Sequence, residues 1–264
     1  MIEILLFFCY SFLGWCCECI YCSIPAKKFI NRGFLEGPYC PIYGVGALLV
    51  IYLLLPYKTH PITLFVIGTL LVTTLEYITS WLMEIMFHTR WWDYSNYRFN
   101  IHGRVCLLNA ILFGIMVLVV CYGIHPVILN LISYLTRMQQ GILCILLCIG
   151  FLIDLTTTTY ALLRKNSDFR EIEASIHALY SLFKQTNIFP QEEPLSQTIQ
   201  RILDSTDADE ILLSHIQELR NKIQTFHSHQ KHTVKRLMKA FPNHRENRRE
   251  VFERIFKVFD EHRK

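Results

Sequence analysis

Residues 31–47 read NRGFLEGPYCPIYGVGA and lie between two apolar runs. The stretch holds four glycines and two prolines, together with an arginine and a glutamate. Glycine permits left-handed or crowded backbone, whereas proline fixes φ and removes a hydrogen-bond donor. This combination beside apolar segments indicates a loop whose backbone is shaped for a purpose. We expect the flanking helices to form walls around it.

Charge and hydropathy divide the chain into two parts. Of its 264 residues, 52% are hydrophobic, and the mean hydropathy is +0.28. Residues 1–163 carry eight Lys/Arg and seven Asp/Glu, whereas residues 164–264 carry eighteen and fifteen. We therefore predict a transmembrane domain over 1–165 and a cytoplasmic helical tail over 166–264. The net charge of +4 is too small to favour nucleic acid as a partner.

A helix that crosses a bilayer needs about 20 apolar residues. The sequence predicts about five spans and an all-α, polytopic membrane helical bundle with a helical C-terminal domain. The expected spans are residues 2–24, 41–55, 61–87, 105–124 and 141–163. We read the first as a retained helix, because it lacks a basic segment and a cleavage site typical of signal peptides.

Basic residues predict the orientation in the plasma membrane. With the N-terminus outside, the loops 25–40 and 88–104 and the tail face the cytoplasm. These two loops carry six basic residues, and the outer loops carry only Lys58 and Arg137. Both motif-bearing loops then lie on the same face. The six are Lys27, Lys28, Arg32, Arg90, Arg98 and Arg104.

Four carboxylates fall within the cytoplasmic halves of the expected spans, namely Glu18, Glu76, Glu84 and Asp154. Ionisable groups inside a membrane face the bundle interior or water and find partners, so they mark functional sites by default. The alternative is structural: the loop arginines pair with the carboxylates and hold the bundle together. Asp154 is the weaker candidate, because the threonines at 156–159 can bond their own helix backbone.

The sequence favours no cofactor and assigns no catalytic residue. It contains no phosphate-binding Gly-x4-Gly-Lys-Ser/Thr motif, so the chain itself is not predicted to be an ATPase. No nucleophile, base and acid arrangement is visible, which argues against an enzyme without excluding one. Cys19 and Cys22 form a CxxC pair, but no second ligand pair accompanies it, and we expect no metal.

The tail is predicted to be helical at 168–185, 195–203 and 208–226. Residues 231–249 follow with seven Lys/Arg against one acid, and 248–262 carry an apolar stripe. A small helical bundle with a solvated basic face explains this pattern. The alternative is contact with anionic lipids of the inner leaflet, so membrane lipids are expected partners.

Several motifs together resemble the putative ABC-transporter type IV family of bacterial membrane proteins, over roughly residues 1–163. The resemblance implies a permease that works with a separate ATPase subunit, and it implies no substrate. Five spans are few for a whole permease, so a second copy or another partner is expected. The motifs are FLGW at 12–15 with Glu18, NRGFL at 31–35 with Gly37 and Pro38, PIYG at 41–44, Glu76-Tyr77 with Glu84, RWWDY at 90–94, and residues 100–107.

The leading hypothesis is a transport component with a polar pocket at the cytoplasmic membrane edge. The alternative is a membrane enzyme that acts on a lipid or lipid-linked substrate at the inner leaflet, with arginines binding phosphate and a glutamate as base. A third is a sensor or scaffold whose tail is the output. The expected pocket residues are Trp15, Glu18, Arg32, Tyr43, Glu76, Glu84, Arg90, Trp91, Asp93, Arg104 and Asn109.

Overall fold

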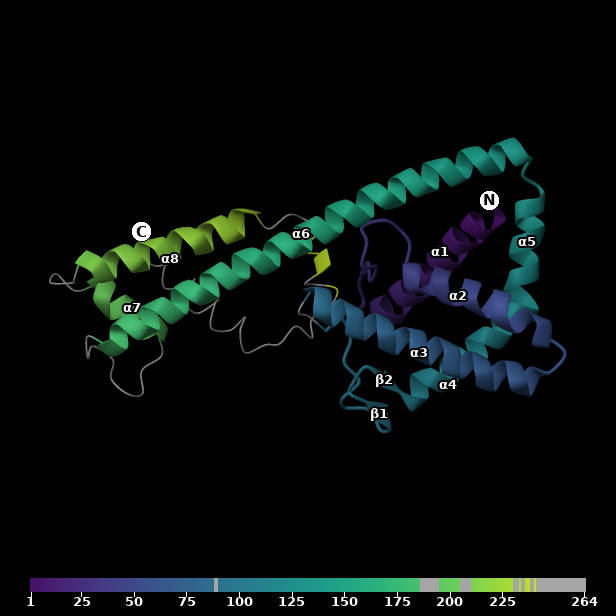
Figure 1. Ribbon diagram of the computed structural model, residues 1–264, viewed down its shortest axis with the longest axis horizontal. Coiled ribbons are helices and arrows are strands. Elements are labelled where there is room, and N and C mark those ends of the chain that lie inside the picture. The colour runs from purple at the N-terminus through teal and green to yellow at the C-terminus, as the bar shows by residue number, and fades with distance from the viewer. Residues whose placement is uncertain are drawn as a thin grey trace. The chain divides into compact units, whose positions relative to one another are not determined.

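The computed structural model describes residues 1–87, 90–185, 195–204 and 210–229, with the single residues Thr233, Arg236, Leu237 and Ala240. Nearly all of this part is helical (Figure 1), which confirms the all-α class. The α-helices are α1 Ile2–Ala26, α2 Pro41–Leu54, α3 Pro61–Phe87, α4 Leu107–Val119, α5 His125–Ser133, α6 Arg137–Gln185, α7 Leu195–Asp204 and α8 Glu210–His229. The short elements are the 3₁₀ turn η1 Leu55–Tyr57, the π-helical turn η2 Val120–Ile124, and the strands β1 Asn100–Ile101 and β2 Val105–Cys106.

The chain forms two compact units. The first, here called the membrane unit, comprises Met1–Tyr160 with Arg236–Asn243, and the second, the tail unit, comprises Ala161–Lys235 with His244–Lys264. The boundary falls inside α6, a few residues before the predicted one at 165/166. That the tail folds as an independent cytoplasmic domain remains a prediction.

Four helical segments are long and apolar enough to cross a membrane: Ile2–Ala26, Pro61–Phe87, Leu107–Ser133 and Arg137–Leu179. The second predicted span corresponds to a shorter apolar helix, Pro41–Tyr57. At a rise of 1.5 Å per residue it extends about 25 Å, less than the ~30 Å hydrocarbon core. The chain is therefore a multi-pass membrane protein, and the crossing by α2 remains a prediction.

Two predicted boundaries are wrong. The fourth span does not end at residue 124, because the helix continues through a π turn and Pro126 to Ser133. Proline removes one helical hydrogen bond and crowds the preceding turn, and a wider π turn directly before it accommodates the ring. Likewise, the fifth span and the predicted tail helix at 168–185 are one continuous helix, α6.

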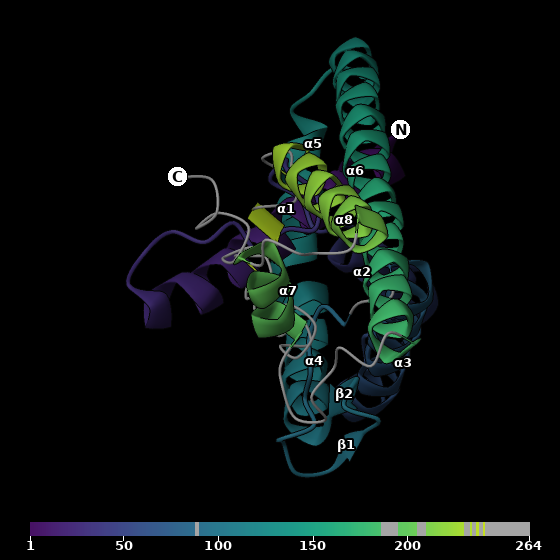
Figure 2. The same cartoon turned by 90° about the vertical axis from the view of Figure 1, so that its left-hand side faces the viewer.

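Glycine allows close packing of helices in the membrane unit. Helix α1 packs along α2, and α3 lies beside α4 (Figures 1 and 2). A side chain at Gly44 would overlap Ser11 and the backbone of Phe7, and one at Gly68 would overlap Val117. Small residues at such contacts let two backbones approach, which matters in lipid because helix association there depends on packing.

The tail unit has an apolar core of its own, to which α6, α7 and α8 contribute. The predicted helices 195–203 and 208–226 are confirmed as α7 and α8, with ends shifted by at most three residues. The predictions for 231–249 and 248–262 lie outside the described residues, apart from four single positions. The core residues are Ile172, Leu179, Ile199, Ile202, Leu212, Ile216, Leu219 and Ile223.

Candidate functional site

Asn31 organises the glycine-rich loop that joins α1 to α2. Its side-chain oxygen accepts hydrogen bonds from Trp15 Nε1 at 2.8 Å and from the backbone N–H of Gly33 at 3.1 Å. Its amide nitrogen donates to the carbonyl oxygen of Glu36 at 3.1 Å. One side chain thus ties both ends of the turn to α1, and Leu35 between them is fully buried.

Asp154 of α6 holds the same loop from another side. Its Oδ2 accepts from the Gly37 N–H at 2.7 Å and from the Tyr39 hydroxyl at 2.9 Å. Its Oδ1 accepts from the Glu36 N–H at 3.1 Å and from the Thr158 hydroxyl at 3.0 Å. Four donors therefore surround one carboxylate, and charge-assisted hydrogen bonds of this kind are stronger than neutral ones. The loop is fixed by a carboxylate within an apolar helix.

Arg236 binds the carbonyl side of the loop. Its guanidinium donates to the carbonyl oxygens of Gly33 at 2.8 Å, Phe34 at 3.0 Å and Asn31 at 3.4 Å. Burial lowers the pKa of Arg236, and the negative charges of Glu36 and Asp154 oppose that shift. The backbone of the loop therefore meets an anion on its N–H side and a cation on its carbonyl side.

Arg32, which was expected among the carboxylates, donates to the carbonyl oxygen of Ala240 at 2.7 Å. Both residues of this contact belong to the membrane unit. The predicted grouping of Arg32 with the three glutamates remains a prediction.

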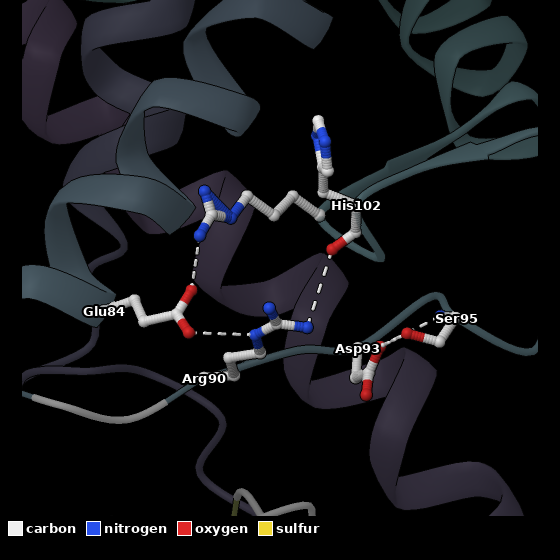
Figure 3. A network of polar contacts seen from close by, with 6 residues as sticks. Glu84, Arg90, Asp93, Ser95 and His102 are labelled. Carbon is white, nitrogen blue, oxygen red and sulfur yellow. Dashed lines mark hydrogen bonds and ion pairs between the residues drawn. The ribbon is translucent and has the colours of Figure 1, made fainter.

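Glu84, near the end of α3, forms ion pairs with two arginines (Figure 3). Arg90 Nε lies 3.1 Å from Oε1, and an amino nitrogen of Arg104 lies 2.5 Å from Oε2. The second guanidinium also stacks over the ring of Tyr77, 5.5 Å from its centroid. Three of the predicted pocket residues thus come together as an ion-paired group.

A short hairpin places Arg104 in this group. Strands β1 and β2 pair antiparallel, and the turn between them carries His102 at φ 54° and Gly103 at φ 69°. Two successive positive φ values are typical of the type I′ turn that suits a twisted hairpin. A side chain at Gly103 would overlap Ser95 and Asp93, so this position requires glycine.

Asp93 has a structural role at the base of this hairpin. It is exposed, and its Oδ1 accepts from the hydroxyl and the backbone N–H of Ser95 (Figure 3). These two hydrogen bonds lower the pKa of Asp93. The structure shows the aspartate fixing a turn.

The two remaining carboxyl groups, those of Glu18 and Glu76, each accept a hydrogen bond from a tyrosine hydroxyl. Tyr43 of α2 donates to Glu18 Oε1 of α1 at 2.7 Å, and Tyr94 donates to Glu76 Oε1 of α3 at 3.2 Å. Burial raises the pKa of Tyr94 well above its ordinary value, and an ionised carboxylate at Glu76 or Glu18 would raise it further. Both glutamates therefore act on the same tyrosine. Ser80, one turn along α3 from Glu76, is also buried.

The two motif-bearing loops touch through aromatic rings. Trp91 is buried, and its ring packs edge-on against Phe34 of the glycine-rich loop, with centroids 5.2 Å apart. It also meets Phe87 at the end of α3, at 6.2 Å. Asn109, by contrast, lies half-buried on the first turn of α4. It makes no hydrogen bond to the other predicted pocket residues among those described.

Sequence reasoning missed the roles of Asn31, Tyr94 and Arg236 and undervalued Asp154. The aspartate did carry a signal, because it stands alone within an apolar run. Arg236 carried none, since it is one of many basic residues in its stretch. Within the described residues, no group of three His, Cys, Asp or Glu could hold a metal ion.

These features define a multi-pass membrane protein with a buried carboxyl group, Glu76, in one of its apolar helices. A family model described as Putative ABC-transporter type IV matches residues 5–159, more than half of the chain, so the chain belongs to that family. The match covers nearly all of Met1–Tyr160 and confirms the resemblance noted from the motifs. No curated protein and no solved structure matches the chain.

Proposed function

We propose that the chain is the membrane-spanning subunit of a transporter that a separate ATPase drives. Family membership supports the transporter class, and the sequence contains no phosphate-binding motif that would supply ATP hydrolysis. The observation that carries the location of the site is the burial of Glu76, together with the half-buried Glu18 and Glu84 and the two loops. Ionisable groups kept away from lipid mark substrate or ion pathways in membrane proteins.

In this proposal the glycine-rich loop and the hairpin 94–106 form the polar end of the pathway. The contact between Phe34 and Trp91 joins them, and Asp154 and Arg236 fix the loop backbone. The bias of basic residues favours the cytoplasmic side for this end, with the N-terminus outside. A subunit of this size works with a second copy or with another membrane partner.

The test is purification of the tagged chain from its native membrane in mild detergent, followed by identification of stoichiometric partners. We expect an ATPase subunit that carries a phosphate-binding loop, and ATP hydrolysis by the reconstituted complex that depends on the membrane subunit. Asp154→Asn should reduce that dependence because it weakens the loop. Thr157→Val is the matched control, since Thr157 is exposed on the same helix and its hydroxyl bonds the helix backbone. If the purified chain has no ATPase partner, the proposal fails.

A second candidate function is an enzyme that acts on a lipid headgroup. It is favoured by the excess of positive charge where two arginines share Glu84. Arg104 Nε is also buried without a hydrogen-bond partner among the described residues. A phosphate would suit two such guanidinium groups. Chemical turnover of added phospholipid by the chain alone, lost in Arg104→Lys, would favour this function over transport.

A further inference from the structure

Glu76 is the most enclosed carboxylate of the membrane unit. Its residue surface is 7% exposed, and it lies within the candidate span Pro61–Phe87. One oxygen, Oε1, accepts the hydrogen bond from Tyr94. The other oxygen, Oε2, is buried and has no hydrogen-bond partner among the described residues. A charged carboxylate in such a place would leave an anionic oxygen without water or a donor, which is a large desolvation penalty.

No basic side chain among the described residues neutralises Glu76. The nearby arginines of the hairpin region, Arg90 and Arg104, both pair with Glu84, about two turns further along α3. The described ion pairs include none to Glu76. The two glutamates of this helix therefore differ in their partners: Glu84 pairs with two arginine side chains, and Glu76 pairs with none among the described residues.

The titratable groups that surround Glu76 are acidic or neutral. Glu18 of α1 and Tyr94 are the groups that act on it. Tyr43 of α2 bonds Glu18, and Cys106 of β2 acts on Tyr94. Helix α4, which packs along α3, carries no titratable side chain. An ionised Glu18 would make a charge at Glu76 still less favourable, because like charges oppose each other's ionisation.

A bound proton would neutralise the buried carboxylate of Glu76, whereas the described residues provide no set of ligands for a metal ion. Hard cations take six or more oxygen ligands, and within the described residues no group of three His, Cys, Asp or Glu could hold one. A single proton neutralises the carboxylate and turns its unpaired oxygen into a hydroxyl donor. Thr73, three residues earlier on the same helical face, also has a buried hydroxyl oxygen with no partner among the described residues, and the two atoms are not hydrogen-bonded to each other.

We propose that Glu76 is a proton-binding site inside the membrane unit, which holds a neutral carboxylic acid at neutral pH. Tyr94 donates to its carbonyl oxygen, and the bound proton resides on Oε2. The proton comes from water and returns to water, so no other reactant is needed. The site is defined by burial and hydrogen bonding alone and does not depend on a transport function.

The direct test is infrared spectroscopy of the full-length protein in lipid nanodiscs. A protonated carboxylic acid shows a carbonyl stretching band that a carboxylate lacks. We expect the wild-type protein to show this band at neutral pH, Glu76→Gln to lose it, and Glu84→Gln to keep it. The last variant is the matched control on the same helix, because Glu84 is ion-paired. A band of equal intensity in Glu76→Gln would overturn the proposal.

Thermal unfolding measured across pH provides a second test. It distinguishes a proton-binding Glu76 from a Glu76 that only supports the packing of the helices. Because the folded state holds a proton that the unfolded chain releases, wild-type stability should fall as pH rises above the ordinary range of glutamate. The linkage of one proton changes the folding equilibrium by at most about tenfold per pH unit. Glu76→Gln resembles the protonated acid in shape and charge, so it should unfold no lower than wild type and should lose this pH dependence.

The same measurements distinguish a proton from a sodium ion. In sodium and in choline salts at one pH, the acid band and the unfolding midpoint should be equal. Absence of the band, together with a midpoint that rises with sodium, would overturn the proposal in favour of a cation site. If Glu76→Gln does not fold, the wild-type band and its decrease at alkaline pH still decide the matter, because no such band is expected from an ionised Glu76.

Discussion

Asp154→Asn should release the glycine-rich loop from α6. In the wild-type protein each carboxylate oxygen accepts from one backbone N–H and one hydroxyl: Oδ2 from Gly37 and Tyr39, and Oδ1 from Glu36 and Thr158. Asparagine has almost the same shape, but one of the two oxygens becomes an NH₂ group that cannot accept. The hydroxyl beside it can rotate and accept from the new NH₂. The backbone N–H beside it cannot, so one amide loses its partner whichever way the side chain turns.

The magnitude follows from the type of bond that is lost. A hydrogen bond to a charged group contributes about 1.5–3 kcal/mol, and the half-buried position of Asp154 favours the lower end of this range. Since 1.4 kcal/mol corresponds to a factor of ten, hydrogen exchange at Glu36 or Gly37 should become about 10- to 30-fold faster. Exchange in the α1–α2 helix pair should stay unchanged, because the lost bond holds the loop alone.

The assay is hydrogen–deuterium exchange on peptides that cover residues 31–40, with the protein in nanodiscs. Thr157→Val serves as the control, because Thr157 is exposed and its hydroxyl bonds carbonyl oxygens of its own helix. Unchanged exchange at both amides in Asp154→Asn would refute the reasoning. It would mean that Asn31 and Arg236 hold the loop without Asp154.

Three further predictions concern other parts of the chain. The hydrogen bonds from Ser95 lower the pKa of Asp93, so they stabilise the hairpin above the ordinary pKa of aspartate, about 4, and this contribution is lost as pH falls through the lowered value. Protection of the amides over residues 94–106, measured against the intrinsic exchange rate at each pH, should decrease on acidification in wild type. In Asp93→Asn this protection should be low and should not change with pH. The positive-inside bias predicts an external N-terminus and a cytoplasmic tail. A reporter that works only in the cytoplasm should therefore be active when fused after Lys264. Activity at that position of a reporter that works only on the outer side would reverse the topology. The apolar core of the tail unit predicts that residues 166–264 expressed alone are soluble and helical by circular dichroism, whereas a random-coil spectrum would show that the tail orders only on the membrane domain or on lipid.

The sequence by itself determined the class of this protein. Long apolar runs must satisfy their backbone hydrogen bonds within one segment, and so they become helices in a membrane. The motifs of the first 160 residues were enough to indicate the family. The threonines at 156 and 157 bond their own helix carbonyls, as their position predicted.

Sequence reasoning was less reliable where one helix passes into the next. The π turn before Pro126 and the continuity of α6 depend on how neighbouring helices support the backbone. Hydropathy reports only the tendency of each segment to enter lipid. It therefore located the spans and misplaced their ends.

Only the tertiary structure decided the partner of each charge. Four intramembrane carboxylates with similar sequence surroundings received different partners: two arginines for Glu84, one tyrosine each for Glu18 and Glu76, and loop amides for Asp154. Arg236 reaches a loop more than 200 positions away in the sequence. The physical reason is that an ion pair or hydrogen bond depends on distances of a few ångströms, and helix packing sets those distances while local sequence does not.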